Sequence, residues 1–74
     1  MQSQKTNTIE IVVNGQLRQV PEGRPLLEIL GFLGVDLSRI AVELNRSIVK
    51  RPAWGEVMVG PGSTLEIVQF VGGG

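Results

Sequence analysis

The chain has 74 residues, enough for one small domain, and a domain of this size buries only about 60% of the surface that its unfolded chain exposes. Hydrophobic residues make up 42% and charged residues 19%, which suits a folded globule and excludes a disordered chain. Seven basic residues balance seven acidic ones, so the formal net charge is zero and the basic excess of a nucleic-acid-binding protein is missing.

Three residue types are absent from the whole sequence: Cys, His and Tyr. Without Cys there is no disulfide framework, no thiolate nucleophile and no iron–sulfur cluster. Without His the usual zinc ligand and the commonest general base are missing. These absences disfavour an enzyme with its own active site.

The first seven residues are polar and lack the apolar core of a signal peptide. No apolar run approaches the roughly 20 residues that a membrane-spanning helix needs. We therefore expect a cytoplasmic protein without membrane contact, with a disordered leader at 1–7 and a folded domain at 8–71.

The first elements predict a β-hairpin. Residues 9–13 are rich in β-branched side chains, Asn14-Gly15 is a strong turn signal, and residues 16–20 form the return strand, which stops at Pro21. A two-residue turn fixes the cross-strand pairs, which are Ile9 with Val20 and Val12 with Leu17.

A helix is predicted next. Pro25 suits its first turn, because the missing N–H costs little there, and Gly34 suits its end. Apolar residues recur at helical spacing, so one face packs on a sheet. These residues are Leu26, Ile29, Leu30 and Leu33.

The second half of the chain predicts a strand at 40–44, a short strand at 47–49 and a single helical turn near 50–54. Trp54, the only Trp, is expected to cover one end of the core. After a tight turn, residues 64–71 form the last strand, which we expect to be the longest.

This order of elements is that of an α+β domain with the β-grasp, or ubiquitin-like, fold. It predicts a mixed sheet of four to five strands with one main helix packed across it. The last strand is expected to lie parallel to the first in the middle of the sheet, so that residues 72–74 leave from an end of the sheet.

Three glycines, Gly72, Gly73 and Gly74, follow the last strand. Glycine has no Cβ, so we expect a thin, flexible tail that fits a narrow slot in another protein. Its carboxylate is a poor electrophile until ATP converts it to a mixed anhydride with AMP, which a sulfur or nitrogen nucleophile then attacks. The alternative is an ordinary frayed end.

Val68 and Phe70 share one face of the last strand with Glu66. One interpretation makes them a partner-docking patch at the base of the tail. The other makes this a central strand buried on both faces, which also has a continuous apolar sequence.

Short stretches from Ile9 to Gly74 match one family. They are Val13-Asn14-Gly15, Leu26–Leu30, Ala41–Asn45, Arg51 with Trp54, Leu65–Val68 and Val71–Gly74. On these residues the chain resembles the sulfur-carrier proteins of thiamine biosynthesis, the ThiS family. It departs from the family's pattern at Lys50, where Pro is frequent, and at Gly62-Ser63, where an acidic Gly-Asp turn is frequent.

The resemblance implies a carrier that is not itself an enzyme and holds no permanent cofactor. An E1-like adenylyltransferase (ThiF type) would use ATP and Mg to form a glycyl adenylate at Gly74, with Gly72 and Gly73 recognised as the tail. Sulfur from a cysteine-desulfurase persulfide would displace AMP. The resulting thiocarboxylate would serve thiazole synthase (ThiG type).

Two alternatives stay open. A sibling carrier with the same tail chemistry would serve molybdopterin synthesis, tRNA thiolation or cysteine synthesis. A β-grasp interaction module, such as a regulatory or RNA-binding domain, would need no glycine tail, and the neutral net charge disfavours RNA.

Overall fold

The computed structural model describes residues 7–71, so the predicted tail at Gly72, Gly73 and Gly74 and nearly all of the predicted leader lie outside the described residues. The described chain contains five strands, one α-helix and one 3₁₀ turn. In chain order they are β1 (Thr8–Val13), β2 (Gln16–Pro21), α1 (Leu26–Leu33), β3 (Ile40–Leu44), β4 (Ser47–Ile48), η1 (Arg51–Ala53) and β5 (Thr64–Gln69).

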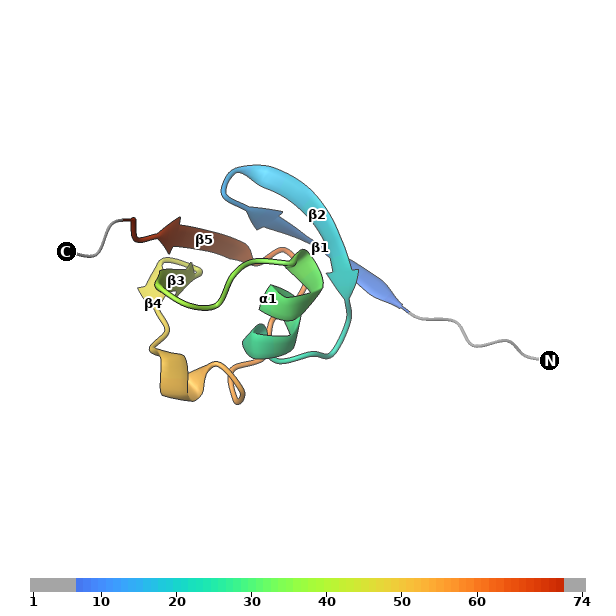
Figure 1. Cartoon of the computed structure of the whole chain (residues 1–74). Coiled ribbons are helices and arrows are strands. Elements are labelled where there is room, and N and C mark those ends of the chain that lie inside the picture. Colours follow the sequence, from blue (N-terminus) through green and yellow to red (C-terminus); the bar gives the residue numbers. More distant parts are fainter. Residues whose placement is uncertain (1–6, 72–74) are drawn as a thin grey trace.

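The strands form one mixed sheet in the order β2-β1-β5-β3-β4. β5 lies in the middle, parallel to β1 and antiparallel to β3. Figure 1 shows α1 packed across one face of this sheet. The predicted β-grasp fold, with the last strand beside the first, is confirmed.

The β1–β2 hairpin has the predicted register, with Ile9 opposite Val20 and Val12 opposite Leu17. Asn14 and Gly15 both have positive φ, at 49° and 83°, as a type I′ turn requires. The turn chemistry therefore sets which side chains of β1 face the helix.

Helix α1 begins after Pro25, whose φ is −73°, and ends at Gly34, whose φ of 77° lies in the left-handed region. The Gly34 N–H donates to the carbonyl of Gly31, which completes the C-terminal cap. Leu26, Ile29 and Leu30 are buried against the sheet, as their spacing predicts. Eight residues make a helix of only about 12 Å, so α1 covers part of the sheet.

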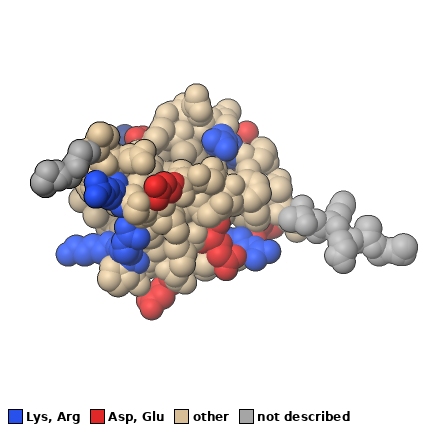
Figure 2. Space-filling view, in the orientation of Figure 1, with Lys and Arg blue, Asp and Glu red and all other residues tan. Residues whose placement is uncertain are grey.

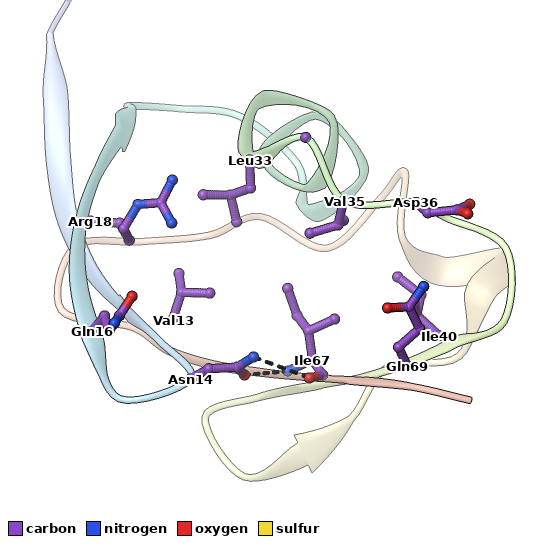
Figure 3. Close-up of a pocket in the computed structure, with 11 residues that line it drawn as sticks. Val13, Asn14, Gln16, Arg18, Leu33, Val35, Asp36, Ile40, Ile67 and Gln69 are labelled. Carbon is purple, nitrogen blue, oxygen red and sulfur yellow. Dashed lines mark hydrogen bonds between the residues drawn. The ribbon is translucent and has the colours of Figure 1, made fainter. Parts of the chain in front are cut away.

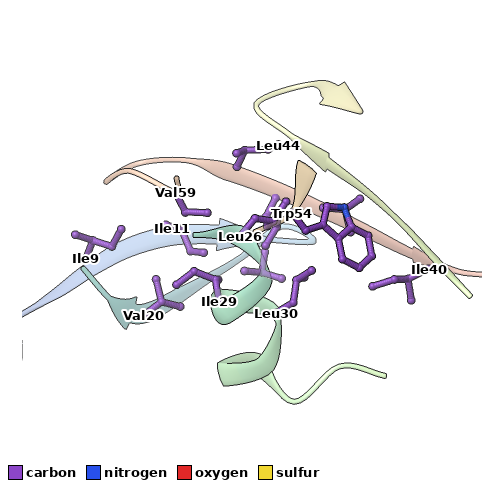
Figure 4. Packing of buried hydrophobic residues seen from close by; sticks show 13 residues of the cluster. Ile9, Ile11, Val20, Leu26, Ile29, Leu30, Ile40, Leu44, Trp54 and Val59 are labelled. Carbon is purple, nitrogen blue, oxygen red and sulfur yellow. The ribbon is translucent and has the colours of Figure 1, made fainter. Parts of the chain in front are cut away.

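One hydrophobic cluster forms the core between α1 and the sheet (Figure 4). Its buried members are Ile9, Ile11, Val13, Val20, Leu26, Ile29, Leu30, Ile40, Val42, Leu44, Trp54, Val59 and Leu65. Trp54 is held there by its Nε1–H, which donates to the carbonyl of Val49 at 2.8 Å. The guanidinium of Arg51 lies 4.6 Å from the centre of the Trp54 ring and donates to the carbonyl of Leu37.

One sequence prediction about β5 is wrong. The strand spans Thr64–Gln69 and has six residues, as β1 and β2 do, so it is neither the longest strand nor extended to Val71. Its partner β3 begins at Ile40, which pairs with Gln69, and no ladder continues beyond that pair. A last contact, from the Phe70 N–H to the carbonyl of Arg39 at 2.8 Å, ends the strand.

Candidate partner-docking face

The two faces of β5 have different environments. Leu65 is buried and Ile67 is half-buried on the face that packs toward α1. Val68 is 56% exposed on the opposite face, and Phe70, just beyond the strand, is 55% exposed. A strand covered on both faces is therefore the wrong interpretation of this apolar segment, and a role for Val68 and Phe70 in docking stays a prediction.

The strand register places further apolar side chains beside Val68. Ala41 of β3 is directly opposite Val68, and Ile48 of β4, 70% exposed, is opposite Glu43 of β3. On the other side of β5, Leu17 of β2 is 66% exposed. Leu17 pairs with Val12 of β1, and Val12 pairs with Thr64 of β5, so Leu17 lies on the same face of the sheet as Val68. We call this surface the outer sheet face, and it comprises Leu17, Ala41, Glu43, Ile48, Glu66 and Val68.

Two carboxylates lie within the outer sheet face. Glu43 and Glu66 are directly opposite each other in the antiparallel β3–β5 ladder, and both are exposed. Within residues 7–71, neither carboxylate makes a hydrogen bond or an ion pair; the salt bridge there joins Arg24 to Glu28 at 3.0 Å. The sequence does not show this pair, because Glu43 and Glu66 meet only through the register of two distant strands.

A shallow hollow lies on the outer sheet face at this pair of glutamates. Its volume is about 240 Å³. It is lined by Ala41, Val42, Glu43, Ile48, Glu66 and Val68. Apolar walls and two carboxylates thus meet in one depression of the outer sheet face.

Two asparagines from hairpin turns fix the position of β5. The carboxamide of Asn14 donates to the carbonyl of Ile67 at 3.2 Å and accepts from its N–H at 2.7 Å, as Figure 3 shows. Asn45, after β3, accepts from the Thr64 N–H at 2.9 Å. The backbone N–H of Asn45 also donates to the Thr64 carbonyl at 2.8 Å, so β5 is held from both sides.

A second hollow, of about 430 Å³, lies on the other face of the sheet, where α1 ends (Figure 3). Leu33, Val35 and Ile67 contribute apolar walls, and Arg18 and Asp36 lie on opposite sides of it. The pKa of Asp36 is lowered by hydrogen bonds from the backbone N–H and the hydroxyl of Ser38. The short helix explains this hollow, since α1 ends before it covers the sheet.

The described residues offer no metal site and no membrane segment. Within 7–71, no group of three His, Cys, Asp or Glu side chains could hold a metal ion. In the same range, no helix is long and apolar enough to cross a membrane.

Figure 2 shows Lys and Arg side chains gathered at the end of the molecule where β5 ends, with acidic groups interspersed over this view.

Within residues 7–71, the mixed sheet with one α-helix on one face and an uncovered outer sheet face defines a β-grasp domain. A family model described as the ThiS family matches residues 11–74. The chain belongs to the ThiS family.

A solved structure supports the same assignment. The thiamine biosynthesis protein (ThiS) from Geobacter metallireducens superposes with a TM-score of 0.76 at 31% sequence identity, covering 89% of this chain and 100% of that one. The fold and the family thus agree.

The curated relatives are much longer proteins. A thiazole synthase of Paramagnetospirillum magneticum is 41% identical over 66 residues, and one of Magnetococcus marinus is 33% identical over 66 residues. Each match covers 89% of this chain but 20% of the relative, so the chain spans about a fifth of the length of these proteins.

Proposed function

We propose that this chain is a sulfur-carrier protein of thiamine biosynthesis, a co-substrate of other enzymes rather than a catalyst. The observation that carries the proposal is the ThiS family match over residues 11–74. The structural similarity to a thiamine biosynthesis protein supports it.

The proposed chemistry takes place at Gly74, in the active site of an E1-like adenylyltransferase. The carboxylate attacks the α-phosphorus of Mg-bound ATP, so that an acyl–phosphate bond forms and pyrophosphate leaves. Hydrosulfide then attacks the acyl carbon, AMP leaves, and a thiocarboxylate remains. ATP and Mg are substrates of the activating partner, and the carrier binds neither permanently. In the cell, a cysteine-desulfurase persulfide is the proposed source of the sulfur; a thiol attacks its inner sulfur, so that hydrosulfide leaves and a disulfide remains.

The proposed acceptor is a thiazole synthase. Proteins with that name contain a segment that is 41% and 33% identical to this chain, within polypeptides about five times as long. Joining two modules in one polypeptide raises the concentration of each near the other, which favours modules that act on one another. This relationship supports thiazole synthase over the acceptors of the sibling carriers.

The outer sheet face and Phe70 are the proposed contact with the activating enzyme. Val68 and Phe70 are more than half exposed, although apolar side chains of this size are usually buried. They lie at the end of β5 that leads to the glycines at 72–74. Docking there would hold the tail close to the partner's active site.

A two-stage reaction tests the proposal. The chain is first incubated with an E1-like adenylyltransferase, ATP and sulfide, then purified and mixed with thiazole synthase. We expect the carrier to gain sulfur in the first stage and lose it in the second. A parallel reaction uses the large subunit of molybdopterin synthase as acceptor. Sulfur lost only to that subunit would replace the thiamine assignment with a sibling carrier.

A further inference from the structure

Glu43 and Glu66 bring two acidic side chains to neighbouring positions on the outer sheet face. They are direct cross-strand neighbours in the β3–β5 ladder. Like charges in this position destabilise a sheet. No cationic side chain within residues 7–71 forms an ion pair with either of them. Within residues 7–71, the two glutamates therefore lie side by side without an ion-pair partner.

Docking of a partner on the outer sheet face adds a desolvation cost for the two carboxylates. Ile48 lies across from Glu43, and Val68 follows Glu66 on the same face of β5. A partner that covers Ile48 and Val68 must also remove water from the two carboxylates between them. Burying a charge without a counter-charge is strongly unfavourable. A purely apolar partner surface therefore does not fit the outer sheet face.

The residues that line the hollow indicate which kind of side chain from a partner would fit it. Ala41, Ile48 and Val68 offer aliphatic contacts, and Glu43 and Glu66 place two negative groups in the same depression of about 240 Å³. Arginine and lysine combine an apolar stem with a cationic head, so their stems bury well against such walls. The fork of an arginine, in particular, has donors for both carboxylates.

We propose that this hollow is the socket for an arginine or lysine side chain of the activating enzyme. This inference rests on the proposed function, since it names the chemistry of the surface that the carrier docks on. The cation neutralises the repulsion between Glu43 and Glu66, and the docked surfaces shield the contact from water, which strengthens it.

Two other occupants fit less well. A second copy of this chain, docked face to face, would bring two more carboxylates toward the first pair. A metal ion would need more ligands, and within residues 7–71 no group of three suitable side chains exists. A cationic side chain satisfies both the charge and the apolar walls.

The test compares adenylation of two double variants with that of the wild-type chain, measured as pyrophosphate release by the E1-like enzyme. Glu43→Gln/Glu66→Gln removes the charges but keeps the shape of the socket. Glu22→Gln/Glu56→Gln removes the same net charge from two exposed loop residues away from the outer sheet face. We expect the first variant to raise the KM for the carrier about tenfold with kcat unchanged, and the second to change it by less than about twofold.

Thermal unfolding of the free domains separates binding from folding. The Glu43→Gln/Glu66→Gln variant should unfold at the same temperature as the wild-type chain or a few degrees higher, because a repulsion is removed. Salt should raise the KM of the wild-type chain more than that of this variant.

Three outcomes contradict the inference. Equal KM values for the wild-type chain and the Glu43→Gln/Glu66→Gln variant would exclude a cation in the socket. Equal increases for both double variants would indicate general attraction by net charge instead. A wild-type chain that is not adenylated, by an enzyme proven active on another carrier, would overturn the proposed function itself.

Discussion

Asn14 and Ile67 are 53 positions apart in the sequence, yet two hydrogen bonds join the side chain of one to the backbone of the other. Asn14 also forms the β1–β2 turn, with a φ of 49°. One residue thus closes the hairpin and holds the strand that leads to the predicted tail.

Asn14→Gly separates these two roles, because glycine keeps the positive φ but loses the carboxamide. We expect a loss of about 1–2 kcal/mol in the free energy of unfolding, measured with urea, from two missing hydrogen bonds. Arg46→Gly is the matched control, since Arg46 has a φ of 71° and its side chain makes no such bond to β5. That variant should be neutral or slightly stabilised, and equal losses in both variants would contradict the role of the carboxamide.

Trp54→Phe tests the buried indole. Trp54 is 2% exposed, and its Nε1–H is bonded to the Val49 carbonyl. Phenylalanine leaves that carbonyl without its donor and fills less of the core, so we expect a loss of about 2–4 kcal/mol in the free energy of unfolding. A change below about 0.5 kcal/mol would mean that the core rearranges around the ring.

The hairpin register, the helix and its glycine end could be predicted from the sequence, because each depends on turn chemistry or on local spacing. The exposed face of β5 could not. Val68 and Phe70 are as apolar as Leu65, so the sequence pattern fits a strand buried on both faces equally well. What leaves them exposed is the placement of α1 on the opposite face, a tertiary relationship.

The cross-strand pairing of Glu43 with Glu66 could not be predicted from the sequence either. The two residues come from strands separated by about twenty residues, and their pairing depends on the β3–β5 register. The length of β5 depends on the same register, since the strand ends where β3 begins at Ile40. Contacts of this kind are decided by the whole sheet, whereas sequence patterns report local preference.

Phe70→Glu tests the docking role of the end of β5. Because Phe70 is 55% exposed, we expect the free domain to unfold within a few degrees of the wild-type temperature. Adenylation by the E1-like enzyme should slow at least about tenfold, since a charge replaces an apolar contact in an interface. Phe32→Glu is the control, as Phe32 is 58% exposed on α1, on the other side of the sheet.

Equal effects of Phe70→Glu and Phe32→Glu on adenylation would remove the argument for a specific docking face. An unfolded Phe70→Glu domain, judged by circular dichroism, would show instead that Phe70 is needed for the core.

Deleting Gly73 and Gly74 tests whether the tail contributes to the fold. Residues without side chains bury little apolar surface, so the midpoint of thermal unfolding should stay within about 1–2 °C of the wild-type value. Adenylation should disappear, because the proposed reactive carboxylate is gone. A large fall in the midpoint would mean that the glycines pack against the domain.

The most direct measurement is the intact mass of the chain after incubation with an E1-like adenylyltransferase, ATP and sulfide, followed by peptide mapping. Our account predicts a gain of about 16 Da, as one oxygen is replaced by sulfur through an activated acyl group, and places it on the peptide that contains Gly74. Omitting ATP should abolish the gain. Sulfur on any other peptide, or an unchanged mass with an enzyme that modifies another carrier, would contradict the central claim.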